Sequence, residues 1–262
     1  MLTTVAEIRA MLREADETEL AALERSLAAD TRKGVREALA AARKRVDAAK
    51  QERARVAVLY DFERTLAGGE GEAIIVGLDE VGRGSLAGPL AVGAVVLPKT
   101  PHIPGLNDSK QVKPENRALI ADEIQKHSLA CAVQYVDPAD IDRFGMSTSL
   151  RRAFAGALSQ IEAQGVVPDV VLVDGNPLHL DEREISVVKG DAKCASIAAA
   201  SILAKARRDA LMCELAPRYP LYAFDENKGY SSPHHIEAIK AHGLSDVHRR
   251  SFCTSFLQES LF

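Results

Sequence analysis

The sequence has few cysteines, no long apolar run and no excess of basic residues, and each absence narrows the class of protein. Its four cysteines are far apart and form no Cys-x-x-Cys pair, which indicates a reduced cytosolic protein without a disulfide or zinc framework. No stretch is apolar enough to span a membrane, and the first residues carry early charges without the apolar core of a signal peptide. We therefore expect a cytoplasmic protein with no membrane association.

The formal net charge of −4 argues against a strongly basic nucleic-acid binder. The charge is unevenly distributed along the chain. Residues 1–31 carry more acids than bases, whereas residues 32–55 carry nine bases and three acids. A basic segment inside a mildly acidic protein can follow a phosphate backbone, although many such segments are solvated helix faces. Both interpretations stay open.

Residues 4–67 are rich in Ala, Leu, Glu, Arg and Lys, with apolar residues at helical spacing, which predicts helices with a break at residues 31–34. The glycine-rich residues 68–71 read as a linker. We expect a helical N-terminal extension over residues 1–70 and a second domain over residues 71–262. The extension is either a solubilising or packing appendage or a substrate-affinity element that binds phosphates through Arg43-Lys44-Arg45, Lys50, Arg53 and Arg55.

From residue 71 onward, short apolar runs and helical patterns indicate an α/β domain. We expect strands at residues 73–79, 90–97, 129–136, 169–173 and 184–188, with the first three as an antiparallel meander. Helices are predicted at residues 114–127, 147–164, 192–214, 233–242 and 245–250. A chain of 262 residues is long enough to bury one such core and carry an appendage.

The most informative segment is the apolar strand at residues 73–78, which is followed directly by Asp79 and Glu80 and then by Gly82-Arg83-Gly84. Two neighbouring carboxylates are costly to bury unless a cation such as a metal ion lies beside them. Because adjacent strand residues point to opposite faces, the strand must end or twist at this pair. A dinucleotide-binding loop is disfavoured, since its third glycine is one residue late and Pro89 leads into another strand.

Two further acids lie in comparable places. Asp174 ends an apolar strand at a glycine, and strand ends are where α/β sheets present their chemistry, although a lone Asp-Gly is usually a turn. Asp191 precedes a helix rich in Ala and Ser, so it either caps that helix or joins the other acids in one site. Four cations nearby are either solvated or form a rim that neutralises phosphate: Lys189, Lys193, Lys205 and Arg208.

Several segments together resemble type 2 ribonuclease H (ribonuclease HII), in that family's order along the chain. The resemblance implies a ribonuclease H-like α/β fold, with a five-stranded mixed sheet flanked by helices and an α-helical N-terminal extension. It implies a metal-dependent endoribonuclease that cuts the RNA strand of RNA–DNA hybrids and nicks 5′ of single ribonucleotides in duplex DNA, leaving 3′-hydroxyl and 5′-phosphate ends. The matching segments are residues 76–89, 107–110, 172–175, 190–193, 201–209 and 228–230.

The resemblance also assigns roles to single residues. It implies that four acids, Asp79, Glu80, Asp174 and Asp191, are catalytic and hold two Mg²⁺ or Mn²⁺ ions. Without metal these acids should repel one another and raise at least one pKa. It also implies substrate binding by Gly82, Arg83 and Gly84 around the ribonucleotide and by Tyr230 at the neighbouring deoxyribose. Lys110 and Lys193 are expected on phosphates. From the residues alone, Tyr230 is a half-buried loop aromatic and Lys110 a solvated lysine.

The end of the chain carries two further candidates. We expect His234 and His235, and likewise His248-Arg249-Arg250, at the surface or on a nucleic-acid backbone. The last five residues resemble the peptide by which bacterial replication and repair enzymes bind a sliding clamp, with Gln258, Leu261 and Phe262 as anchors. Alternatively, this tail folds back on its own domain.

We expect a monomer that binds RNA–DNA hybrid and ribonucleotide-containing duplex DNA. Two rival functions are a DNA nuclease of the same fold and a non-catalytic nucleic-acid-binding module. The second is disfavoured, because binding a polyanion gives no reason to gather four acids at strand and helix ends.

Overall fold

The computed structural model describes residues 4–69 and 72–257, and the chain divides between Arg55 and Val56 into two compact units. The first unit is helical: α1 (Val5–Glu14) and α2 (Glu17–Ser26) share an apolar core with the first half of α3 (Lys33–Leu66). Asp16 caps α2 with a capping box, so the chain breaks there as well as at the predicted residues 31–34. The helical nature of the N-terminal region is confirmed.

The end of α3 belongs to the second unit. Val56, Leu59 and Tyr60 are buried there in one apolar cluster with residues of α4 (Pro114–His127) and α7 (Ala195–Leu215). The carboxylate of Glu63 accepts hydrogen bonds from the backbone amide and the hydroxyl of Ser196, at 2.8 and 2.7 Å. The domain boundary near residue 70 stays a prediction, and the helix that leads up to it is part of the second core.

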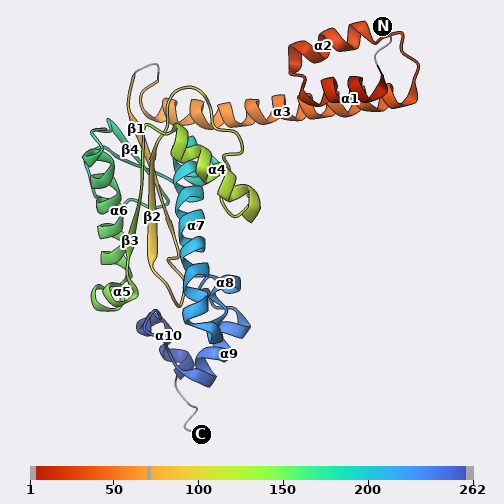
Figure 1. The fold of residues 1–262 in the computed structure, drawn as a ribbon. Coiled ribbons are helices and arrows are strands. Elements are labelled where there is room, and N and C mark those ends of the chain that lie inside the picture. Colours follow the sequence, from red (N-terminus) through yellow and green to blue (C-terminus); the bar gives the residue numbers. More distant parts are fainter. Residues whose placement is uncertain (1–3, 70–71, 258–262) are drawn as a thin grey trace. The chain divides into compact units, whose positions relative to one another are not determined.

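The second unit is built on a five-stranded mixed sheet in the order β3-β2-β1-β4-β5 (Figure 1). β1 (Ile75–Val81), β2 (Leu90–Val96) and β3 (Ala130–Val136) form the predicted antiparallel meander. β4 (Val170–Asp174) runs parallel to β1, and β5 (Glu184–Val187) runs parallel to β4. The predicted five-stranded mixed sheet is confirmed, and β1 lies at its centre.

Helices cover both faces of this sheet (Figure 1). On one face, α6 (Met146–Ala163) packs on β2 and β3. On the other, α7 (Ala195–Leu215) packs on β1 and β2, and α4 (Pro114–His127) packs on α7. The approach of α7 is close, because a Cβ on Gly77 would lie 2.2 Å from the carbonyl carbon of Ser196. Glycine in β1 and small residues in α7 therefore place the sheet and helix together.

The chain after α7 differs in part from the prediction. Three α-helices of the described residues follow it: α8 (Phe224–Asn227), α9 (Pro233–His242) and α10 (Arg250–Leu257). Before α6 the structure also has a short helix that was not predicted, α5 (Pro138–Phe144). The helix predicted at residues 245–250 is wrong, because α10 begins only at Arg250. His248 pairs with Ala87 in a β-bridge, and the amide of Arg249 donates to the Leu86 carbonyl at 2.8 Å, which holds these residues out of the helix.

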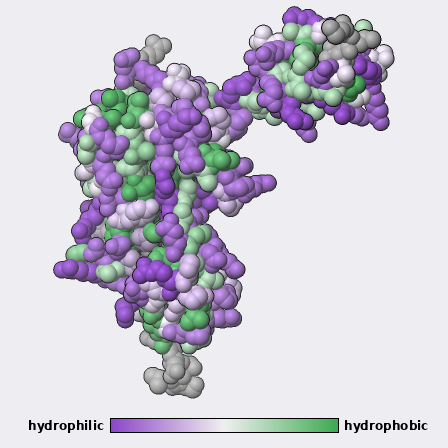
Figure 2. Space-filling model, in the orientation of Figure 1, coloured by the Kyte–Doolittle hydropathy of each residue, from purple (hydrophilic) through white to green (hydrophobic). Residues whose placement is uncertain are grey.

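Hydrophilic residues cover most of the face that Figure 2 presents, with scattered apolar areas. Within the described residues, no helix combines the length and apolar character needed to cross a membrane.

Candidate active site

A cavity of about 430 Å³ lies where β1 and β4 end, and the four predicted acids all line it. Asp79 and Glu80 come from β1, and Asp174 is the last residue of β4. Asp191 lies in η1 (Gly190–Ala192), the short 3-10 helix before α7. Because Leu78 pairs with Val173 in register, Asp79 and Asp174 are the next residues of two adjacent parallel strands. The sheet register brings together residues that are far apart in the sequence.

Of the two alternatives expected at Asp79 and Glu80, an end or a twist of β1, the end is wrong. The strand continues to Val81 along β2, and its pairing with β4 stops at Leu78. Asp79 is 6% exposed, and the Glu80 side chain is 19% exposed. Both line the cavity, which opens where the ladder with β4 has ended.

Asp174 and Asp191 are connected through Gly190. The Gly190 amide donates to Oδ1 of Asp174 at 2.6 Å. A Cβ on Gly190 would lie 2.5 Å from Cδ1 of Ile197, so the close approach requires glycine. The alternative interpretation of Asp191 as the cap of the following helix is wrong, because α7 begins after Cys194. Its carboxylate lines the cavity instead.

Burial and mutual repulsion disfavour the charged forms of these acids. Burial, followed by repulsion from Asp174 and Glu80, raises the pKa of Asp79 to about 8. Burial also raises the pKa of Glu80, against the opposing effect of Arg83, whose Nη1 lies 3.4 Å from Oε1 of Glu80. The pKa of Asp191 is raised by burial and then by Asp174. The expectation that at least one pKa rises is confirmed, with burial as the larger cause.

The donor set fits hard divalent cations, because carboxylate oxygens are the ligands that Mg²⁺ and Mn²⁺ prefer. Within residues 4–69 and 72–257, no three His, Cys, Asp or Glu side chains are already grouped closely enough to hold one ion. The four acids instead line the cavity from β1, β4 and η1. Cations among these acids would favour their charged forms.

The two glycines of the Gly82-Arg83-Gly84 loop have different surroundings. Gly82 is buried at φ +85°, and a Cβ there would lie 2.2 Å from Nε of Arg208. Gly84 is exposed, and its Cβ would have no heavy atom within 4 Å. Gly82 is therefore required by the fold, whereas Gly84 leaves its backbone open to a ligand. Gly82 and Arg83 line the cavity; Gly84 lies just beyond its lining.

Tyr230 also lines the cavity, beside two cations of α7. Nζ of Lys205 lies 5.4 Å from the centre of the tyrosine ring, and the guanidinium carbon of Arg208 lies 5.3 Å from it. Lys205 pairs with Asp209 at 2.7 Å. The expectation that Arg208 belongs to a solvated or phosphate-binding rim is wrong: it is fully buried, and it donates to the carbonyl oxygens of Pro89, Lys228 and Ala87 and to Ser85 Oγ.

Other predicted residues fall inside or outside the cavity. Lys110 lines it, whereas Lys193 does not and donates to the Val188 carbonyl at 2.8 Å. Sequence reasoning did not place Ser109 and Ser201 in the site. Their hydroxyls lie 2.9 Å apart, and Ser201 favours the charged form of Asp79 by hydrogen bonding. The spacing of Ser201 and Lys205 by one helical turn is the signal that connects them.

The histidine and arginine predictions near the chain end need correction. His235, His248 and Arg249 are at most 2% exposed, so they do not lie at the surface. His235 and His248 hydrogen-bond to each other, and Arg249 donates to the distant carbonyls of Gly88 and Arg83. His234 and Arg250 are exposed, as expected. The predicted clamp-binding residues, Gln258, Leu261 and Phe262, lie outside the described residues.

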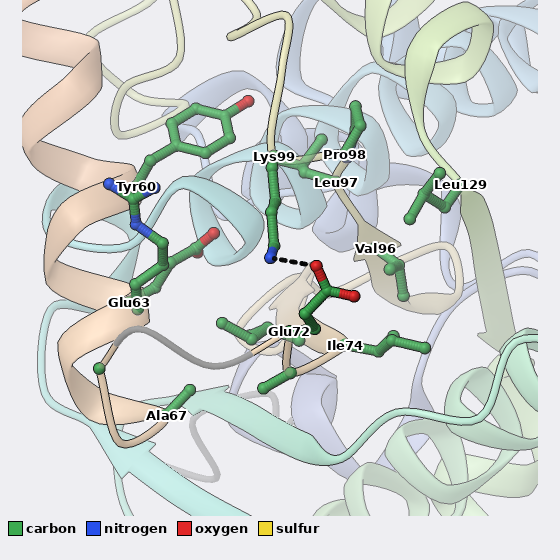
Figure 3. A pocket seen from close by; sticks show the side chains of 14 residues that line it. Tyr60, Glu63, Ala67, Glu72, Ile74, Val96, Leu97, Pro98, Lys99 and Leu129 are labelled. Atoms are coloured by element: carbon green, nitrogen blue, oxygen red, sulfur yellow. Dashed lines mark ion pairs between the residues drawn. The ribbon is translucent and has the colours of Figure 1, made fainter.

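A smaller cavity of about 110 Å³ lies at the start of β1 and contains none of the predicted site residues (Figure 3). Tyr60 and Glu63 of α3 line it, together with the ion pair between Lys99 and Glu72 at 3.6 Å. It lies at the opposite end of β1 from the four acids. The larger cavity is the candidate active site because all four acids line it.

Two family models match the chain, the ribonuclease HII N-terminal domain over residues 4–67 and ribonuclease HII over residues 76–255. The ribonuclease HII of Bacillus mycoides (strain KBAB4) is 39% identical over 226 residues, which are 86% of each chain. That of Geobacillus sp. (strain WCH70) is 39% identical over 249 residues, 95% of this chain and 88% of the relative.

Solved structures agree on the fold. The ribonuclease H2 of Pyrococcus horikoshii OT3 is 27% identical and matches with a TM-score of 0.59 over 71% of this chain and 99% of its own. The ribonuclease HII of Archaeoglobus fulgidus, solved in a complex with PCNA, is 25% identical with a TM-score of 0.60 over 72% and 98%. A ribonuclease HIII, Bst-RNase HIII, solved with Mn²⁺, is 23% identical with a TM-score of 0.51 over 68% and 65%. The two family models and the two bacterial relatives show that the chain belongs to the ribonuclease HII family of metal-dependent endoribonucleases, which cleave the RNA of RNA–DNA hybrids.

Proposed function

We propose that this cavity cleaves RNA–DNA hybrids, and nicks 5′ of single ribonucleotides in duplex DNA, with two divalent cations, Mg²⁺ or Mn²⁺. The observation that carries the proposal is the lining of one cavity by Asp79, Glu80, Asp174 and Asp191. The products are a 3′-hydroxyl and a 5′-phosphate. Asp79, Glu80, Asp174 and Asp191 would hold the divalent ions, which would supply activation of water and stabilisation of negative charge, so that no side-chain nucleophile is needed.

The chain's own contribution is to hold the acids in place. Asp79 is positioned by the strand and by Ser201, and Asp174 by the Gly190 amide. Glu80 lies beside Arg83, an exposed cation that can exchange this carboxylate for a substrate phosphate. Lys110 and Lys205 add positive charge to the same cavity, which favours the approach of a polyanion to an acidic centre.

Selection of ribose requires groups that recognise a 2′-hydroxyl. The open backbone at Gly84 offers an amide, and the Tyr230 ring offers a flat apolar surface with a polar tip. We assign Gly82, Arg83 and Gly84 to the ribonucleotide and Tyr230 to the neighbouring deoxyribose. Lys193 lies outside the cavity and, in this proposal, contacts phosphate further along the duplex.

Contacts in the first unit favour its packing role. Arg43 pairs with Glu24, Lys50 and Arg53 pair with Glu17, and Arg45 donates to the carbonyl of Ala15. These bases fix α3 against α1 and α2. Because exposed ion pairs contribute little to stability, phosphates can still compete for the arginines. Substrate affinity remains the second candidate role of this unit.

The central test compares three duplexes: an RNA–DNA hybrid, DNA with one ribonucleotide, and DNA alone. We expect Mg²⁺-dependent cleavage of the first two by the wild-type chain. Cleavage of all-DNA at a similar rate would favour the rival DNA nuclease. Binding of all three without cleavage in Mg²⁺ or Mn²⁺ would favour the non-catalytic binding module.

We also propose that the tail anchored by Gln258, Leu261 and Phe262 binds a sliding clamp. The proposal rests on its sequence, and the structure solved with PCNA concerns another protein. Replacing Leu261 and Phe262 with alanine should abolish retention by an immobilised bacterial clamp while cleavage of short duplexes is kept. Loss of cleavage instead would indicate a tail that folds back on the domain.

A further inference from the structure

His248 and Arg249 are consecutive buried residues that the proposed chemistry does not use. They precede α10 and are 2% and 0% exposed. Buried charged and imidazole side chains are expensive unless their hydrogen bonds are satisfied. Their hydrogen-bond partners therefore show what these two residues do for the fold. The partners of His248 lead to Tyr230, and those of Arg249 lead to the Gly82-Arg83-Gly84 loop.

The His248 side chain is the middle of a hydrogen-bond chain with only one consistent pattern of protons. The Ser245 amide donates to Nδ1 of His248 at 3.0 Å, so the proton of His248 is on Nε2. That nitrogen lies 3.0 Å from Nε2 of His235, which accepts. Nδ1 of His235 then carries a proton and donates to the Tyr230 carbonyl at 2.8 Å. Burial lowers the pKa of both rings, to about 4 for His248, which keeps the two neutral.

Arg249 reaches the other segment directly. Its Nε donates to the Gly88 carbonyl and its Nη1 to the Arg83 carbonyl, each at 3.0 Å. Its Nη2 is buried without a hydrogen-bond partner. Burial, followed by repulsion from Arg208, lowers the pKa of Arg249 to about 9. Arg249 is therefore a costly residue to bury, and its hydrogen bond to the Arg83 carbonyl connects it to the Gly82-Arg83-Gly84 loop.

The contact with Arg83 sets the direction of an amide. In a trans peptide, the carbonyl oxygen of one residue and the amide hydrogen of the next point in opposite directions. The Arg83 carbonyl points at Arg249, so the Gly84 amide points away from it. Gly84 is exposed, and no acceptor for its amide lies in the part of the chain that the structure describes. The amide is therefore held ready for an external acceptor.

We infer that His248-Arg249 is a positioning element for ribose recognition: Arg249 aims the Gly84 amide, and His248 fixes Tyr230 through His235. One two-residue segment thus holds both substrate-reading groups at a constant separation. The inference rests on the proposed roles of Gly84 and Tyr230 in substrate binding.

The test is a double-mutant cycle in the full-length protein, with kcat/KM measured on a single-ribonucleotide duplex. His248→Met keeps the volume and removes the donor, and we expect a loss of about 10- to 100-fold, as for a displaced substrate-binding group. His248→Gln is the matched control, because its amide can donate to His235, and it should recover most of the loss. In a Tyr230→Ala background, His248→Met should add less than about twofold.

Arg249→Lys supplies the second arm. It should lower kcat/KM on the hybrid and on the single-ribonucleotide duplex alike, and its effect should persist in the Tyr230→Ala background because it acts through Gly84. Full additivity of His248→Met with Tyr230→Ala, or equal activity of the Met and Gln variants, would overturn the inference. If Tyr230→Ala alone leaves single-ribonucleotide cleavage unchanged, the proposed role of Tyr230 fails instead, which is a distinct outcome.

Discussion

Adding one methyl group to either glycine of the Gly82-Arg83-Gly84 loop should have opposite consequences. Gly84→Ala places its Cβ where no heavy atom lies within 4 Å, and the φ of Gly84 is outside the left-handed region. Gly82→Ala places its Cβ 2.2 Å from Nε of Arg208, at φ +85°. Gly84→Ala should therefore spare the fold and affect the ligand, whereas Gly82→Ala should damage the fold itself.

The magnitudes follow from these surroundings. A left-handed non-glycine residue costs about 1–2 kcal/mol, and overpacking costs about 1–3 kcal/mol, so Gly82→Ala should destabilise by about 2–5 kcal/mol. In a chain of this size the melting temperature then falls by about 4–20 °C. Gly84→Ala should leave it unchanged or raise it slightly, because alanine restricts the unfolded chain by about 0.4–1 kcal/mol.

Catalysis separates the two substitutions further. A methyl group between a site and a closely bound substrate costs about 1–3 kcal/mol, or 10- to 200-fold in kcat/KM. We expect that loss for Gly84→Ala on a single-ribonucleotide duplex, with a wild-type melting temperature measured by calorimetry. Wild-type kcat/KM for Gly84→Ala would refute the reasoning, because substrate would then not approach this backbone. A large fall in melting temperature would refute the structural half.

Three further predictions concern the acids and α3. Asp79→Asn should lower the cleavage rate by orders of magnitude while substrate binding is kept. Millimolar Mg²⁺ should raise the melting temperature of the wild type much more than that of this variant, and equal shifts would contradict metal binding at Asp79. A chain that begins at residue 56 should stay folded, whereas one that begins at residue 71 loses three buried apolar side chains of α3, about 4–9 kcal/mol; equal melting temperatures would place α3 outside the core. Burial raises the pKa of Glu63 to about 7 from its usual 4.5, so its contribution to stability is complete below pH 4.5 and is lost as pH rises through about 7. Glu63→Gln should flatten that part of the curve of melting temperature against pH, and parallel curves would contradict it.

The sheet and the acids could be predicted because their signals are local. β2 and β4 are short apolar runs and β1 begins as one, and Asp79 and Asp174 come directly after the apolar residues of β1 and β4. Parallel pairing of β1 with β4 then places both acids at one edge of the sheet.

The buried cations could not be predicted, because their partners are distant in sequence. Arginine is mostly exposed in proteins, so a local pattern places it at the surface. Arg249 is buried because the carbonyls of Arg83 and Gly88 accept its hydrogen bonds from more than 160 residues away. The β-bridge of His248 with Ala87 and the hydrogen bond from the Arg249 amide to the Leu86 carbonyl hold these residues out of the helix that their composition predicts. Nothing in the neighbouring sequence carries that information.

The burial of Arg208 explains why glycine is needed at position 82. The Arg208 guanidinium satisfies the carbonyls of Pro89, Lys228 and Ala87 and lies beneath the Tyr230 ring, and it fits there because Gly82 has no Cβ. Gly82 thus admits the cation that supports Tyr230, Arg83 pairs with Glu80, and Gly84 keeps its amide open. A substitution at Gly82 should therefore disturb Tyr230 as well as the loop, whereas a substitution at Gly84 should not. The three residues of one short motif act through three separate physical constraints.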